Sequence, residues 1–148
     1  MGELASRGKR FLGAMVDSLI VFLVMLPIMF IMGVFSKIDS NGQLPIGLQI
    51  GLAIAGIVLF VILNGQFLAQ DGQTLGKKII STRIVGIDDQ PVNFVKIYLI
   101  RYLAVSLIVQ IPIAGAIFGL VDALFIFSNK DKRCLHDLMA GTKVIDAK

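Results

Sequence analysis

A carboxylate at the head of a long uncharged run constrains this chain more than any other feature of its sequence. No residue from Ser18 to Phe35 carries a charge, and Asp17 comes directly before this run. A helix of about 20 apolar residues crosses the hydrocarbon core of a bilayer, and an ionisable group carried into it costs about 2.5–3.5 kcal/mol on insertion scales. Asp17 therefore predicts a functional site within the membrane. Its first candidate partner is Arg10, about two helical turns earlier on the same face.

Composition extends this interpretation to the whole chain. Hydrophobic residues make up 56% of its 148 residues and charged residues only 16%, which is far from the balance of a soluble domain. We therefore expect one all-α membrane domain over residues 1–148, a helical bundle built from three to four hydrophobic segments. Their expected bounds are about 11–35, 46–69, 92–110 and 112–128.

The last apolar stretch leaves the number of crossings open. As one helix, residues 92–127 would be about 54 Å long, nearly twice the hydrocarbon thickness. Pro112 is the expected break, giving a hairpin in which Arg101 and Asp122 meet at the same depth and form an ion pair. In the alternative, residues 92–109 lie on the membrane surface as an amphipathic helix, with Arg101 reaching the interface, and the rest forms a third span.

Basic residues set the expected orientation. Three precede the first apolar run, four lie in 71–96 and five follow residue 129, whereas Lys37 alone lies between the first two runs. Cytoplasmic loops carry the excess of Lys and Arg, so we expect a multi-pass protein of a bacterial inner membrane with both termini in the cytoplasm. The net charge of +4 is then explained by topology and by contact with anionic membrane lipids, and we expect no nucleic-acid partner.

Two segments outside the apolar runs predict a small β element on the cytoplasmic face. Residues 79–87 are rich in β-branched side chains with partial alternation, and residues 142–146 show a similar pattern. We expect the two segments to pair. Within the second apolar run, Gly47, Gly51 and Ala55 are four positions apart, a spacing that favours close helix packing, either inside the chain or across a homodimer.

Three short motifs resemble those of one family. They are Arg10–Asp17 (RFLGAMVD), Gln73–Lys78 (QTLGKK) and Leu135–Thr142 (LHDLMAGT). In this order, in an otherwise apolar chain, they closely resemble the RDD family of small bacterial membrane proteins, named for one arginine and two aspartates. The resemblance implies that Arg10 is the arginine and Asp17 the first aspartate. The second aspartate is then Asp137 or Asp122, and the implied function is transport, because some members look like sodium/proton antiporters.

The antiport interpretation uses an intramembrane carboxylate. Asp17 would bind Na⁺ or H⁺ in turn, and Arg10 would tune its affinity for the proton. Asn64, or carbonyl groups freed at a break near Pro27, would complete the ligands of the cation. The expected function is then exchange of a monovalent cation for a proton across the membrane.

A structural interpretation assigns the same charges to the fold. Arg10, Asp17 and Asp137 would form an ion-pair network that clamps the C-terminal segment onto the first helix. Arg101 and Asp122 belong to the same structural or gating set. The protein would then be a non-transporting structural, assembly or regulatory membrane protein. The size of the chain favours this structural interpretation, because 148 residues are few for an alternating-access transporter. If the protein does transport, we expect it to work as a homo-oligomer.

Other signals favour ordinary explanations. The glycine-rich segment that ends in Lys77 and Lys78 is one residue short of a phosphate loop between its glycines and lacks Ser or Thr after the lysines. We expect these lysines to meet anionic lipid head groups instead of a nucleotide. Cys134, His136 and Asp137 are too few and too closely spaced for a closed zinc site. We therefore expect no metal, no cofactor and no enzymatic activity.

Overall fold

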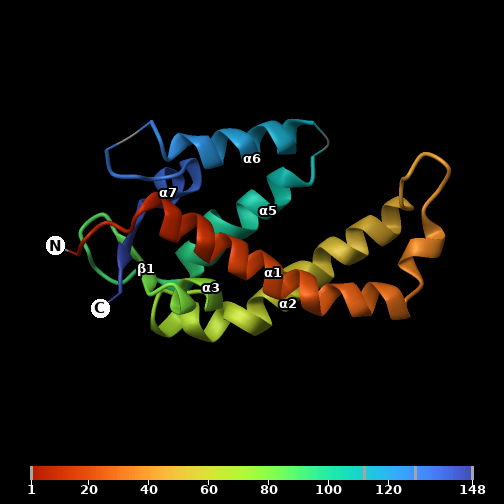
Figure 1. Cartoon of the computed structure of the whole chain (residues 1–148), viewed down its shortest axis with the longest axis horizontal. Helices are drawn as coiled ribbons and strands as arrows, with labels where there is room; N and C mark the ends of the chain where they lie inside the picture. The colour runs from red at the N-terminus through yellow and green to blue at the C-terminus, as the bar shows by residue number, and fades with distance from the viewer. Residues whose placement is uncertain (1, 112, 129, 148) are drawn as a thin grey trace.

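Two long apolar helices make up the first half of the molecule. The structure is a computed structural model that describes residues 2–111, 113–128 and 130–147. Helices α1 (Arg7–Ile31) and α2 (Ile46–Gln70) have 25 residues each and are long and apolar enough to cross a membrane. They form a hairpin whose connection, with the short 3-10 helix η1 (Val34–Lys37), lies far from both chain termini (Figure 1).

The start of α1 and its course past Pro27 follow from local sequence. The Ser6 side chain accepts a hydrogen bond from the Lys9 backbone N–H at 3.2 Å and so caps the helix. Pro27 lies inside α1, which continues to Ile31. A membrane helix tolerates proline where its surroundings satisfy the freed carbonyl group. The expected break near Pro27 is therefore wrong.

A small polar unit follows α2 and also receives the end of the chain. Helix α3 (Leu75–Ile79) leads into β1 (Thr82–Gly86), and α7 (Leu135–Ala140) leads into β2 (Thr142–Asp146). The strands pair in antiparallel register, so the predicted pairing is confirmed. β1 begins at Thr82 and not at residue 79, because Thr74 caps a helical turn that occupies the preceding residues.

The remaining apolar stretch folds as a second, shorter hairpin (Figure 1). Its first arm comprises α4 (Phe94–Lys96), the π-helix η2 (Ile97–Leu103) and α5 (Ala104–Val109), and its second arm is α6 (Ala114–Phe125). Gly115 lets the arms approach closely, because a Cβ there would lie 2.4 Å from the Val109 carbonyl oxygen. The predicted hairpin is confirmed, whereas Pro112, its expected break, lies outside the described residues. The 12 residues of α6 are too few to cross a bilayer as one straight helix.

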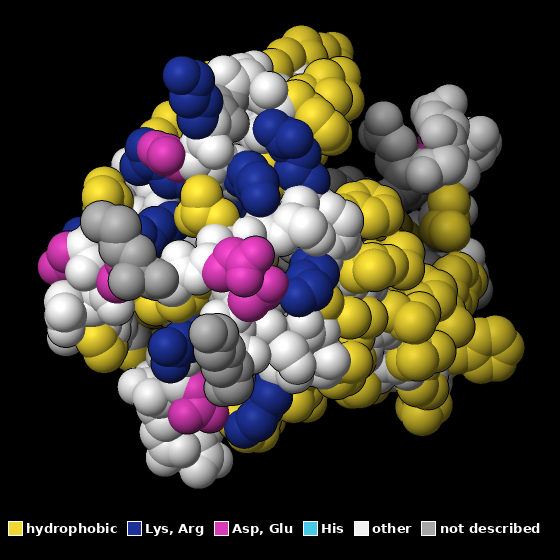
Figure 2. Space-filling model, turned by 60° about the vertical axis from the view of Figure 1, so that its left-hand side comes forward, with side chains coloured by type: hydrophobic (Ala, Val, Ile, Leu, Met, Phe, Trp, Pro, Cys, Tyr) yellow, Lys and Arg dark blue, Asp and Glu magenta, His cyan; other side chains and the backbone are white. Residues whose placement is uncertain are grey.

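Hydrophobic side chains cover the outside of the long helices instead of filling a large core. The buried cluster is small and lies where α2, η2 and the two strands meet: Ala5, Leu68, Ile84, Ile97 and Val144. Figure 2 shows Lys, Arg, Asp and Glu side chains over one part of the surface and hydrophobic side chains over the neighbouring part. An apolar exterior of this extent is the surface of a protein whose helices face lipid.

The small residues of α2 do not pack inside the chain. Gly47, Gly51 and Ala55 are exposed, and a Cβ at either glycine would meet no atom within 4 Å. The predicted internal packing of this stripe is therefore wrong. Packing across a homodimer stays a prediction.

Candidate functional site

Asp137 is the centre of the charged cluster at the polar end. Its side chain is fully buried, and its two oxygens contact different arginines: Oδ2 accepts from Nη2 of Arg10, and Oδ1 accepts from Nη1 of Arg101. The same carboxylate accepts from the Cys134 backbone N–H at 3.1 Å and so caps α7. Thr142 accepts from Arg101 Nη1 at 2.9 Å. One carboxylate thus holds guanidinium groups from α1 and η2 against α7.

Asp122 has a different partner from the one predicted. The His136 backbone N–H donates to it at 2.8 Å, and His136 Nδ1 lies 2.7 Å from Asp122 Oδ2. The predicted Arg101–Asp122 ion pair is therefore wrong. The predicted pair rested only on the equal depth of the two residues along the arms of the hairpin. Helix α7 instead folds back beside both α6 and η2 and supplies separate partners for Asp122 and Arg101. Burial lowers the pKa of His136 to about 4, so its imidazole is neutral near pH 7.

Asp17 lies apart from that cluster and contacts α3. Its oxygens accept from Thr74 Oγ1 at 2.5 Å and from the Gly76 backbone N–H at 2.7 Å, while Lys77 Nζ lies 3.8 Å from Oδ2. The side chains of Asp17 and Lys77 are only 12% and 10% exposed. Asp17 thus has three polar neighbours, all of them on α3 or at its start. The expected partner Arg10 is wrong, because its guanidinium turns toward α7.

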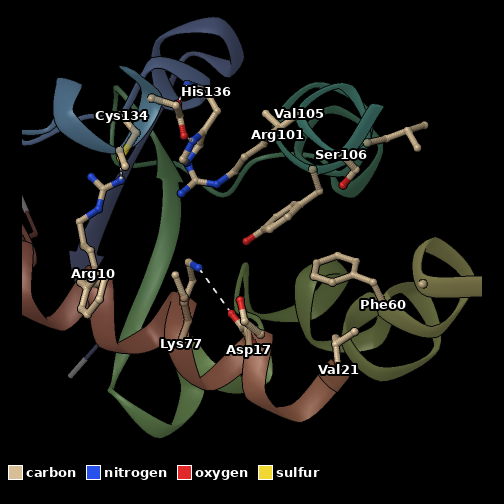
Figure 3. A pocket seen from close by; sticks show the side chains of 18 of the residues that line it. Arg10, Asp17, Val21, Phe60, Lys77, Arg101, Val105, Ser106, Cys134 and His136 are labelled. Carbon is tan, nitrogen blue, oxygen red and sulfur yellow. Dashed lines mark hydrogen bonds and ion pairs between the residues drawn. The ribbon is translucent and has the colours of Figure 1, made fainter. Parts of the chain in front are cut away.

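A cavity of about 1260 Å³ lies between the long and the short hairpin. Asp17 and Lys77 line it, and so do the two arginines that contact Asp137. Figure 3 shows Asp17 and Lys77 on one side of this space, with Arg101 and His136 on another. Apolar side chains continue the wall along the helices, among them Val21, Leu52, Ile57, Phe60 and Val105. The cavity therefore combines an apolar wall, formed in part by both long helices, with a charged end to which α1, α3 and η2 contribute Asp17, Lys77 and Arg101.

Asn64 links α2 to the start of α3 and does not line the cavity. Its Oδ1 accepts from the Leu75 backbone N–H at 2.8 Å, and its Nδ2 donates to the Phe60 carbonyl oxygen at 3.2 Å. The side chain is 2% exposed, and both ends of its amide are used within the fold. This geometry gives Asn64 a structural place at the start of α3 and does not favour the predicted cation-binding role.

The two lysines of the glycine-rich segment lie in different surroundings. Lys78 is half exposed and pairs with Asp71 at 3.3 Å, and its predicted contact with lipid head groups stays a prediction. Lys77 is buried in the cavity wall, which does not fit the predicted contact with lipid. Sequence reasoning missed the Lys77–Asp17 pair, although Thr74 gave a readable signal. As an N-cap it predicts a helical turn that begins at Leu75 and includes Lys77.

Comparison with known proteins points to one family. The model of the RDD family matches residues 4–141. The uncharacterized protein YckC of Bacillus subtilis (strain 168) is 31% identical over 123 residues, which cover 82% of this chain and 73% of YckC. No solved structure matches the chain significantly. Of the two candidates for the second family aspartate, the contact of Arg10 with Asp137 favours Asp137 over Asp122.

Proposed function

The chain belongs to the RDD family, and on that premise we propose that it is a membrane transport protein that exchanges a monovalent cation for a proton. The observation that carries this proposal is the Asp17–Lys77 pair in the wall of the cavity between the two hairpins. A carboxylate and an amine that share one cavity can bind a cation and a proton in turn. Ionisable groups held at a membrane span mark ion pathways.

The exchange follows from charge balance. Without a cation, the Asp17 carboxylate and the Lys77 ammonium neutralise each other at 3.8 Å. A Na⁺ ion that binds the carboxylate and the Thr74 hydroxyl oxygen adds a positive charge beside Lys77, which favours release of the lysine proton. Loss of Na⁺ favours return of a proton. One proton thus leaves for each cation bound, and the net charge of the site is unchanged.

A structural or assembly role is the second candidate, and a different observation favours it. Both oxygens of Asp17 already accept hydrogen bonds from α3, one from Thr74 and one from Gly76. In this proposal the Asp17 contacts and the Asp137 cluster together hold the polar unit against the helices, and no cation binds. The two proposals therefore differ in how the purified protein responds to cations.

The placement of the chain in the membrane is part of the proposal. Both termini lie at the end of the α1–α2 hairpin that carries the polar unit (Figure 1). This supports a multi-pass protein of a bacterial inner membrane with that end in the cytoplasm. Two helices of spanning length per copy, counted over the described residues, and the exposed small-residue stripe of α2 support a homo-oligomer as the transporting unit.

Cation-dependent stability tests the proposal. Thermal unfolding of the purified protein in detergent and chelator is followed through the reaction of a dye with the single thiol, Cys134, while Na⁺ replaces choline at constant ionic strength. We expect Na⁺ to raise the Tm, because a ligand of the native state at 100 times its Kd contributes about 2.7 kcal/mol. Asp17→Asn should abolish this shift. Asp71→Asn should keep it, because that variant removes the carboxylate of an exposed pair.

Two outcomes would contradict cation exchange at Asp17. One is a wild-type Tm that is the same in Na⁺, K⁺ and choline, which would leave the structural proposal. The other is an Asp17→Asn protein that responds to Na⁺ as the wild type does. If Asp17→Asn does not fold, Lys77→Gln replaces it, because this variant keeps the carboxylate. It should still respond to Na⁺ but lose the pH dependence of that response.

A further inference from the structure

The start of α7 brings three metal-ligating side chains together at the cavity. Cys134 and His136 lie there, and α6 contributes Asp122; one ligand atom from each lies within 4.8 Å of the others. His136 and Asp122 are already in contact through Nδ1 and Oδ2 at 2.7 Å. The sequence shows Cys134 and His136 as a close pair, but the third member becomes a neighbour only because α7 folds back against α6.

The donor set fits a divalent transition-metal ion. Thiolate sulfur, imidazole nitrogen and carboxylate oxygen are the ligands of Zn²⁺, at bond lengths of about 2.0–2.3 Å. Tetrahedral bonds of that length place ligand atoms about 3.3–3.7 Å apart. Side-chain rotations that move the three ligand atoms by about 1 Å would therefore let all three bind one ion. All three residues line the cavity, which leaves the fourth position open to water or to a small ligand.

The charges around the cluster also fit. A thiolate and a carboxylate balance the two charges of the ion, and Arg10 Nη2, at 3.4 Å from Cys134 Sγ, favours the thiolate. His136 Nε2 lies 3.8 Å from Asp137 Oδ1. With Nδ1 on the metal, Nε2–H would face this carboxylate, the outer partner that metal-bound histidines usually have.

Binding of the ion displaces the proton of the Cys134 thiol as the sulfur–metal bond forms, so one proton is released when this site fills.

We propose that Asp122, Cys134 and His136 bind one Zn²⁺-class divalent ion, whose open position faces the cavity. The ion ties α6 to α7 beside the buried Asp137 cluster. This site is separate from the Asp17–Lys77 pair, and neither proposal depends on the other. It also revises the expectation of no metal site, which considered only residues close together in the sequence.

Titration with Co²⁺ tests the site directly. The protein is purified with a histidine-free tag, because His136 is the only histidine of the chain. We expect tetrahedral d–d bands and a sulfur-to-cobalt charge-transfer band that saturate at one equivalent and disappear on addition of Zn²⁺. Cys134→Ser should remove the charge-transfer band, and Asp122→Asn should weaken Co²⁺ binding at least about tenfold. Asp131→Asn, a matched control whose side chain is 58% exposed, and Asp17→Asn should bind as the wild type does.

Two results of the Co²⁺ titration would overturn the proposal. One is the absence of a sulfur-to-cobalt band in the wild-type protein at micromolar Co²⁺, and the other is equal Co²⁺ affinity of the Asp122→Asn and wild-type proteins. A second readout needs no variant: Zn²⁺ should slow alkylation of Cys134 by a maleimide at least about tenfold, and a chelator should restore the rate. An alkylation rate that Zn²⁺ does not change would also contradict the site, whether or not the variants fold.

Discussion

Asp137→Asn should cause the largest loss of stability of any single substitution in the polar unit. The carboxylate is fully buried and contacts two arginines whose side chains are themselves 7% and 3% exposed. Removing it leaves two buried guanidinium groups without their shared negative charge. Breaking a buried ion pair on one side costs about 3–5 kcal/mol, and the cap of α7 is weakened as well. Thermal unfolding in detergent, followed by circular dichroism, measures this loss.

Asp131→Asn is the matched control for that prediction. It makes the same chemical change close by in the chain, at an exposed carboxylate paired with Arg133, and we expect a change within about 0.5 kcal/mol. Adding Arg101→Gln to Asp137→Asn should restore part of the lost stability, because one of the two uncompensated charges is then gone. A Tm for Asp137→Asn equal to that of the wild type would show that the cluster does not hold the polar unit.

Gly76→Ala should separate α3 from α1. A Cβ at this position would lie 2.2 Å from the Gly13 carbonyl oxygen and 2.8 Å from Asp17 Oδ1. Neither atom can yield easily, because one belongs to the backbone of α1 and the other accepts the Gly76 N–H. Overpacking a tight contact costs about 1–3 kcal/mol, and here the helices must move apart, which breaks the Asp17 hydrogen bonds too. We therefore expect a lower Tm together with loss of the Na⁺ response proposed above.

Gly51→Ala is the control for the effect of a methyl group in a helix. A Cβ at Gly51 would meet no atom within 4 Å, and alanine is the better helix former by about 1 kcal/mol. We expect this variant to be as stable as the wild type or more stable. Equal Tm values for the Gly76→Ala and Gly51→Ala proteins would show that α1 and α3 do not pack as closely as the structure has them.

Local patterns predicted the elements of this fold. The uncharged run after Asp17 predicted α1, and the shared β-branched pattern predicted the pairing of β1 with β2. Both signals are contained in a few neighbouring residues, and hydrophobicity or backbone preference determines them with little help from the rest of the chain. The choice of Asp17 as a site residue also came from a local argument, the cost of a charge in hydrocarbon.

The partners of the charges were predicted less well, because they depend on where distant elements come to lie. Arg10 and Arg101 both find Asp137 because α7 returns to the cavity, and no spacing in the sequence encodes that return. The same return of α7 places His136 in contact with Asp122. The placement of Lys77 beside Asp17 depends on the close approach at Gly76. A single glycine in a polar segment does not by itself predict a close contact between two helices.

Proton movement in proteoliposomes tests the central claim, that Asp17 and Lys77 exchange a cation for a proton within the cavity. The protein is reconstituted with a pH-sensitive dye inside, the membrane potential is held at zero, and Na⁺ is added outside. The wild-type protein should make the interior alkaline as Na⁺ enters and H⁺ leaves, and Asp17→Asn should not. Alkalinisation no faster than in protein-free liposomes, or equally fast with Asp17→Asn, would contradict the account.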